Sequence, residues 1–137
     1  MAHEKFRVEV LSPEGEIFND EVEMVSTRTT VGSIGVLAHH TPLLAMLDPT
    51  ELRLYRTESE VIRFAQAEGY MQVANNRALI LVEEAHAPNE LDSGELRDRL
   101  KQAESELESA GDDSERRRVA ERDKQRLERF LEIAEGA

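Results

Sequence analysis

The fold class of this chain is decided by residues 70–83, YMQVANNRALILVE. Two strand-like runs, Tyr70 to Val73 and Ala78 to Glu83, flank the dipeptide Asn75-Asn76. Asparagine adopts a positive φ more readily than most residues that carry a side chain, so this dipeptide suits a two-residue hairpin turn. The segment therefore predicts two antiparallel β-strands joined by a tight turn.

Strand patterns continue toward the N-terminus. Phe6, Val8 and Val10 alternate with Arg7 and Glu9, which is the period of a half-buried strand. Many short strands divided by turns predict an antiparallel sandwich or barrel of about ten strands. Further strands are expected over Ile17-Phe18, Val22 to Thr29, Leu43 to Leu47, Leu52 to Tyr55 and Val61 to Ala67, with turns at Pro13-Glu14-Gly15 and Glu58-Ser59 and a chain break in a tight loop around Gly32 and Gly35.

The pattern changes to a helical period after a linker at Ala87-Pro88-Asn89-Glu90. Asp92 with Glu95 resembles a capping box, Gly111 suits the end of a first helix, and Asp113 or Ser114 can cap a second helix. We therefore expect an all-β sandwich over residues 1–87 and an antiparallel α-helical hairpin over residues 88–137. The two apolar helical stripes are Leu96, Leu100, Ala103, Leu107 and Ala110, and then Val119, Ala120, Leu127, Phe130, Leu131 and Ala134.

Composition narrows the class of protein. The chain has 137 residues, which suits one core domain with an appendage. Its formal net charge of −12 repels nucleic acid and anionic lipid. There is no cysteine, so disulfides, thiolate nucleophiles and cysteine-based zinc sites are excluded. The N-terminus shows no apolar core of a signal peptide, and the longest apolar stretches are too short to span a bilayer. Any association with a membrane is expected to go through a partner.

No spacing of residues selects an enzyme. The glycine-rich stretch from Gly32 to Leu37 lacks the Lys-Ser/Thr of a phosphate-binding P-loop. His39 and His40 are adjacent, so in an extended chain they point to opposite sides and cannot easily share a metal ion. Carboxylate pairs such as Glu83-Glu84 carry little information in so acidic a chain, and no nucleophile elbow is present. We expect no catalytic residue, no metal and no cofactor.

The second expected helix is unusually basic. From Glu90 to Asp113 nine acids stand against three bases, whereas from Ser114 to Ala137 six acids stand against seven bases. Three interpretations are open: a solvated helix laced with ion pairs, a surface that docks on an acidic protein, and a grip on a nucleotide phosphate. The seven bases are Arg116, Arg117, Arg118, Arg122, Lys124, Arg126 and Arg129.

Three stretches together resemble one known family. Residues 32–47, GSIGVLAHHTPLLAML, closely resemble the glycine- and histidine-containing motif of the bacterial and chloroplast ATP synthase epsilon family. The opening VLSPEGEIF, with Ser12, Pro13, Gly15 and Phe18 in register, matches the first turn of that family. Residues 67–85 are similar to a third family segment through Gly69, Val73, Asn76, Leu81 and Glu83, although Glu68 replaces the first glycine of a Gly-Gly pair. The tail matches in architecture alone.

The resemblance implies a non-catalytic rotor subunit in the central stalk of an F-type ATP synthase. Such a subunit helps couple proton translocation to ATP synthesis, and its helical hairpin restrains ATP hydrolysis. It would lie at the cytoplasmic side of a bacterial cell membrane, held there peripherally by its partners. By the matching motif, Ser12, His40 and Ala45 are expected near the gamma subunit, and Val31, Gly32, Ser33 and Ile34 near the c-ring. The seven bases of the second helix are expected to meet the acidic lower loops of the catalytic beta subunits, within reach of the alpha subunits.

Some relatives of that family bind ATP at the start of the first helix. Leu91 and Asp92 keep two residues of their motif, but Glu95 stands where an arginine is wanted and would repel phosphate. Arg97 lies about 200° further round the helix. We therefore expect weak or absent ATP binding at Leu91, Asp92 and Arg97. The alternative function is a free-standing β-sandwich that binds ATP or another metabolite, which would require a concave site with convergent polar groups.

Overall fold

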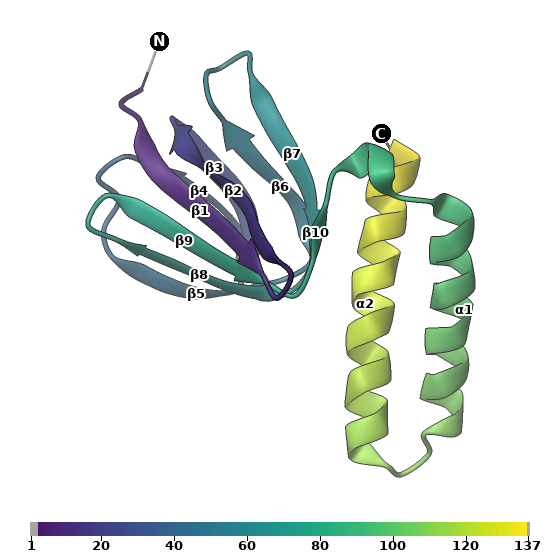
Figure 1. Ribbon diagram of the computed structural model, residues 1–137. Coiled ribbons are helices and arrows are strands. Elements are labelled where there is room, and N and C mark those ends of the chain that lie inside the picture. Colours follow the sequence, from purple (N-terminus) through teal and green to yellow (C-terminus); the bar gives the residue numbers. More distant parts are fainter. Residues whose placement is uncertain (1–2, 137) are drawn as a thin grey trace. The chain divides into compact units, whose positions relative to one another are not determined.

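The computed structural model describes residues 3–136 of the chain, which divide into two compact units (Figure 1). The first unit, Met1–Ala87, contains all the strands, and the second, Pro88–Ala137, contains the helices. An all-β unit followed by a helical hairpin confirms the predicted fold class.

Ten strands of the first unit form two layers. Their order is β10-β7-β6-β3-β5-β8-β9-β1-β2, and among the described residues β4 pairs only with β3. The pairing of β3 with β5 is confined to Thr29 and Leu47, so the sheet folds there into the layers β10-β7-β6-β3-β4 and β5-β8-β9-β1-β2. The strands are β1 (Phe6–Ser12), β2 (Gly15–Val22), β3 (Met24–Thr29), β4 (Gly32–Leu37), β5 (Leu43–Leu47), β6 (Thr50–Tyr55), β7 (Val61–Gln66), β8 (Gly69–Ala74), β9 (Arg77–Val82) and β10 (Ala85–His86).

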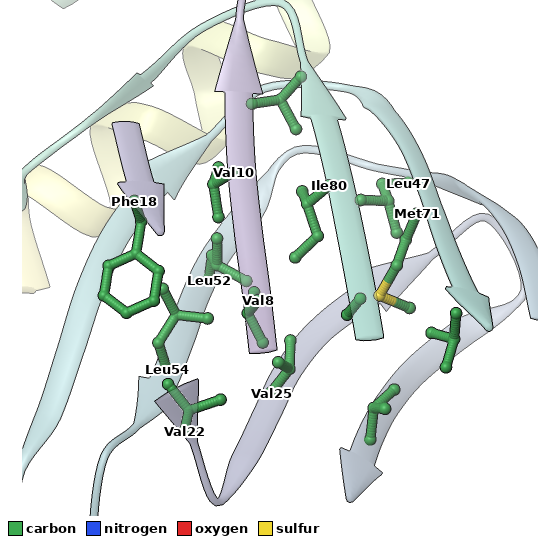
Figure 2. Packing of buried hydrophobic residues seen from close by; sticks show 14 of the residues in the cluster. Val8, Val10, Phe18, Val22, Val25, Leu47, Leu52, Leu54, Met71 and Ile80 are labelled. Carbon is green, nitrogen blue, oxygen red and sulfur yellow. The ribbon is translucent and has the colours of Figure 1, made fainter. Parts of the chain in front are cut away.

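The core lies between the two layers and is built from alternate residues of most strands. Val8 and Val10 of β1, Leu52 and Leu54 of β6, and Ile80 of β9 are fully buried. Figure 2 shows these side chains packed together with those of Phe18, Val22, Val25, Leu47 and Met71. Because the chain has no tryptophan and few other aromatic residues, branched aliphatic side chains supply most of this buried apolar surface.

The β8–β9 hairpin forms as residues 70–83 predict. Asn75 and Asn76 have φ values of 53° and 59°, and Ala74 pairs with Arg77 across the turn. One feature of the sheet differs from the expected antiparallel pattern, because β1 and β9 pair in parallel. These two strands are far apart along the chain, so no turn between them could reveal their relative direction.

The loop predicted around Gly32 and Gly35 is wrong. Both glycines lie inside β4, and the turn is made by Thr30 and Val31 instead. The Thr29 hydroxyl holds this turn, since it donates to the Gly32 carbonyl at 2.9 Å and accepts from the Val31 amide at 3.2 Å. Gly32, the first residue of β4, still serves the turn, because its φ of 142° lies in a region that glycine adopts readily, whereas Gly35 has no positive φ.

The buried side chain of Gln66 joins β7 to β3 in the same layer, and also to the chain just after β5. Gln66 of β7 is fully buried. Its Oε1 accepts from the Thr27 hydroxyl at 2.7 Å, and its Nε2 donates to the Asp48 carbonyl at 3.0 Å. The amide thus has a partner at each end, as a buried polar side chain requires.

The second unit is an antiparallel pair of helices, α1 (Ser93–Ser109) and α2 (Ser114–Gly136), preceded by the short helix η1 (Pro88–Glu90). Asp92 caps α1 by accepting from the Glu95 amide, and the Asp113 carboxylate accepts from the Arg116 amide at the start of α2. The expected stripes are nearly right, but Ile133 is buried whereas Leu131 and Ala134 are half-buried. The buried residues are Leu96, Ala103, Ala110, Ala120, Leu127, Phe130 and Ile133.

Replacing Gly69 with alanine is expected to destabilise the sandwich by about 2–3 kcal/mol or more, since it overpacks a close approach of two backbones. A Cβ atom at Gly69 would overlap the Leu81 carbonyl oxygen and lie 2.8 Å from the Val82 Cα. Urea unfolding measures the effect. Gly35→Ala is the matched control, since its Cβ would meet its nearest neighbour, the Met24 sulfur, at 3.8 Å. Equal unfolding midpoints for the two variants would contradict this account.

Candidate functional surface

One layer of the sandwich has an apolar outer face. Met46 of β5, Tyr70 of β8 and Leu81 of β9 are 57%, 52% and 43% exposed. Met46 pairs with Tyr70, Tyr70 pairs with Leu81, and Leu81 pairs with Leu11 of β1. These four residues, here called the outer row, therefore form one continuous line of apolar side chains across four strands.

The outer row is a surface suited to another protein. Strands lie about 4.8 Å apart, so the row extends for roughly 14 Å. Leu44, which is 73% exposed, adds apolar surface in the next row, where it pairs with Gln72. A contiguous exposed apolar patch of this kind marks an interaction site more often than a solvated face.

Two grooves lie at the ends of the outer row. One of about 390 Å³ lies at the β1–β2 turn and includes Ser12, Tyr70 and Leu81. The other, also about 390 Å³, lies between the β3–β4 turn and β5, and includes Val31 and Met46. Their walls are mostly apolar, and the second contains no charged residue. This chemistry fits the side chains of a protein partner better than a charged metabolite.

The three residues predicted to contact gamma lie in different parts of the sandwich. Ser12 lies next to Leu11 at the end of β1, where its hydroxyl accepts from the Glu14 amide at 3.2 Å. His40 is half-buried in the loop after β4, and its Nδ1 lies 2.7 Å from the Thr41 carbonyl. Ala45 pairs with the fully buried Met71, so it lies on the core side of β5.

The outer row itself was not among the predicted site residues. Its signal is present in the sequence, because β5 and β9 are apolar at almost every position, not at alternate ones. A strand that is apolar on both faces is expected to be covered on both faces. Which of its residues face outward depends on the pairing register, which the sequence alone does not give.

The residues predicted to contact the c-ring lie at the β3–β4 turn and along β4. Val31 is 95% exposed at the tip of the turn. Ser33 is exposed and Gly32 is half-buried, whereas Ile34 packs against the core. The structure thus presents Val31 and Ser33 to a partner more fully than it presents Ile34.

The basic side chains of α2 pair mainly with acids of their own helix. Arg116 is different, because its guanidinium lies 3.3 Å from Glu106 of α1. The other pairs within α2 are Arg117–Glu121 at 3.9 Å, Arg118–Glu115 at 2.7 Å, Arg122–Asp123 at 3.4 Å, Lys124–Glu128 at 3.8 Å and Arg129–Glu132 at 2.8 Å, while Arg126 lines a groove between the two helices. Exposed pairs of this kind contribute about 0–1 kcal/mol each, so a strongly acidic partner surface could replace them.

The residues of the incomplete ATP motif serve the hairpin itself. Asp92 is the N-cap of α1. The Arg97 guanidinium forms an ion pair with Glu135 near the end of α2, which joins the two helices. Leu91 is half-buried. Asp92 and Arg97 therefore already have intramolecular partners in the folded hairpin.

Pairing with a group of opposite charge shifts the pKa of some titratable groups within residues 3–136. Hydrogen bonds to Glu51 and Glu115 raise the pKa values of Arg53 and Arg118, and the hydrogen bond from Arg118 lowers the pKa of Glu115. Among the described residues, no three His, Cys, Asp or Glu side chains gather in a way that could hold a metal ion. None of the helices over this part of the chain is both long enough and apolar enough to cross a membrane.

Comparison with known proteins identifies the family. A sequence-family model described as "ATP synthase, Delta/Epsilon chain, beta-sandwich domain" matches residues 5–88. The chain belongs to the ATP synthase delta/epsilon family. The resemblance found in the motifs is thereby confirmed.

Relatives within the ATP synthase delta/epsilon family extend the match beyond the sandwich. The ATP synthase epsilon chain of Persephonella marina is 35% identical over 130 residues, which cover 94% of this chain and 96% of that protein. The chloroplastic ATP synthase epsilon chain of Adiantum capillus-veneris is 37% identical over 101 residues, or 74% of this chain and 76% of that protein.

Two solved structures share the fold. A chain in the mitochondrial ATP synthase of Euglena gracilis superposes with a TM-score of 0.74 at 24% identity, covering 96% of this chain and 80% of that one. A chain in the central stalk and c-ring structure of Tetrahymena thermophila mitochondrial ATP synthase gives a TM-score of 0.63 at 18% identity, covering 98% and 99%. The fold of a sandwich followed by a helical pair is thus shared with these two chains at low sequence identity.

The Glu115–Arg118 pair is expected to titrate measurably. The hydrogen bond from Arg118, and then its charge, holds the pKa of the Glu115 carboxyl below its ordinary value. Because the folded pKa is the lower one, the pair stabilises the helix above the unfolded pKa and loses this effect as pH falls through the folded value. Arg118→Gln is therefore expected to raise the pKa of Glu115, and Arg118→Lys to raise it less, as followed by carboxyl NMR. An unchanged pKa in Arg118→Gln would contradict the assignment.

Proposed function

We propose that this chain is a non-catalytic rotor subunit in the central stalk of an ATP synthase. Its sandwich anchors the subunit to gamma and to the c-ring, and so helps couple proton translocation to ATP synthesis. Its helical hairpin restrains ATP hydrolysis. The observation that carries the proposal is the outer row, an exposed apolar line on a sandwich that belongs to the ATP synthase delta/epsilon family.

The outer row supports a contact with gamma. Burial of a large apolar side chain contributes about 1.5–3 kcal/mol, so covering Met46, Tyr70 and Leu81 would supply several kcal/mol to an interface. Ser12 extends this surface, because it lines the groove that includes Tyr70 and Leu81. His40 and Ala45 remain candidates for the same interface at its margin.

The β3–β4 turn supports a separate contact with the c-ring. Val31 projects from a turn that the Thr29 hydroxyl holds in place, so its exposed side chain is presented with little conformational freedom. Through gamma and the ring, the subunit would lie peripherally at the cytoplasmic side of a bacterial membrane.

The basic side of α2 supports a regulatory contact with the catalytic subunits. The ion pairs that hold its arginines are solvent-exposed and short in sequence range. Charge-assisted hydrogen bonds to acidic loops of the beta subunits, close to alpha, would be stronger than these exposed pairs. Exchange of partners could then favour an inhibitory state without any chemistry by this chain.

Placing a charge in the outer row is expected to weaken gamma binding. Leu81→Asp removes apolar contact and introduces a carboxylate, so the dissociation constant should rise at least about tenfold. Ser59→Asp, in the exposed β6–β7 loop, is the matched control and should leave binding unchanged. Calorimetric titration of the full chain with purified gamma measures both. Failure of the unmodified chain to bind gamma would refute the stalk assignment and favour a free-standing ligand-binding sandwich.

Removing positive charges from α2 is expected to weaken the inhibition of ATP hydrolysis, while binding to gamma persists. The triple variant Arg117→Gln, Arg122→Gln and Arg126→Gln keeps helix-forming side chains but removes three charges. ATPase activity of the reconstituted head should be suppressed several-fold less by this variant than by the unmodified chain. A control with Arg63→Gln and Arg77→Gln removes charge from the sandwich alone. Equal suppression by all three proteins would show that the α2 arginines play no inhibitory part.

A further inference from the structure

The edge of β4 is open in the described structure. Within residues 3–136, β4 pairs with β3 and with no other strand. The neighbouring strand of the other layer, β5, reaches β3 only at Leu47, so β4 and β5 border a groove of about 390 Å³. One side of β4 is therefore available to another backbone.

The hydrogen bonds of β3 show which N–H and C=O groups of β4 point away from β3. The Arg28 carbonyl accepts from the Asp48 amide at 3.1 Å, so the backbone of Arg28 faces away from β4. Arg28 pairs with Ser33, and Ser26 pairs with Gly35 two residues further along. Since antiparallel pairs alternate between bonded and non-bonded, the N–H and C=O groups of Ser33 and Gly35 point to the open edge.

The β4 edge has none of the features that normally prevent strand addition. Its sequence, GSIGVL, contains no charged residue and no proline, and its register with β3 has no bulge. By contrast, β2 at another edge carries Glu16, Asp20 and Glu21 and pairs with β1 through an irregular register. The third terminal strand, β10, is two residues long.

Charge is absent from a much longer stretch around this edge. No Asp, Glu, Lys or Arg occurs from Thr29 to Leu47, although 34% of the whole chain is charged. This stretch contributes β4, β5 and every residue of the adjoining groove. A partner that enters here would meet backbone hydrogen-bonding groups and apolar side chains, and so should itself be extended and uncharged.

We propose that the open edge of β4 binds an extended, uncharged segment of a stalk partner, which adds a strand to the sandwich. The added strand would exchange hydrogen bonds with Ser33 and Gly35 and place alternate side chains in the groove beside Ile34 and Met46. The proposal rests on the proposed function, because the partner is one of the subunits to which the sandwich is proposed to be anchored. Main-chain hydrogen bonds would make this contact tolerant of side-chain changes in either protein.

Hydrogen exchange of the full chain, alone and assembled with purified gamma and c-ring, tests the proposal. The amides of Ser33 and Gly35 should exchange at least about tenfold more slowly in the assembly, as hydrogen-bonded strand amides do. Amides at the guarded edge of β2 serve as the control and should not change. If the chain assembles but the β4 amides stay unprotected, this inference fails while the stalk assignment stands. If no assembly forms, both fail.

Two variants separate strand addition from simple burial. Gly35→Pro removes the outward N–H at a position where an edge strand tolerates proline, so binding to the assembly should weaken about tenfold. Gly35→Ala keeps the N–H and fits the available space, so it should bind as the unmodified chain does. Equal binding of both folded variants would overturn the proposal. A dimer of the isolated chain with protected β4 amides would also overturn it, because a second copy would then occupy the edge.

Discussion

The apolar core between the two layers fixes the direction of every side chain in β5, β8 and β9. Met71 and Ile80 are fully buried in that core, so their neighbours in sequence must point outward. In β8 and β9 those neighbours include Tyr70 and Leu81, which are large and apolar. Folding of the sandwich and presentation of the outer row are thus two results of one pairing register, since a slip by one residue would exchange the two faces.

The helical hairpin depends on a different balance of interactions. Its buried seam combines large residues, such as Leu127 and Phe130, with small ones, such as Ala103 and Ala120. Ion pairs cross between α1 and α2 near both ends, through Arg97 with Glu135 and Arg116 with Glu106. These pairs are exposed and weakened by salt, in contrast to the core of the sandwich. The two units are therefore stabilised by forces that respond differently to conditions and partners.

Local chemistry explains which features could be predicted from the sequence. The turn at Asn75-Asn76 and the caps at Asp92 and Asp113 depend on the backbone preferences of one or two residues. The turn and the first cap were identified, and Asp113 was one of two candidates for the second cap. The family could also be identified from the sequence, because its motifs are short and contiguous.

Features that depend on long-range pairing were missed. The parallel contact of β1 with β9, the strand conformation of Gly32 and Gly35, and the exposure of the outer row all follow from register and layer order. In α2 the burial of Ile133 instead of Leu131 reflects a small rotation of the helical stripe, which the apolar spacing did not resolve. Ala45, expected near gamma from the motif, is half-buried on the core side of β5 and also lines the groove beside the β3–β4 turn, a placement that depends on the same register.

The buried Gln66 has a mechanical consequence. It links β7 to Thr27 of β3 and to the Asp48 carbonyl beside the corner where the layers join. Apolar contacts are non-directional and let surfaces slide, whereas hydrogen bonds lose strength steeply when their geometry is sheared. A force that shears this corner must therefore break the hydrogen bonds of Gln66 before β7 can move relative to β3. The two hydrogen bonds of Gln66 therefore stiffen the corner at which the layers join.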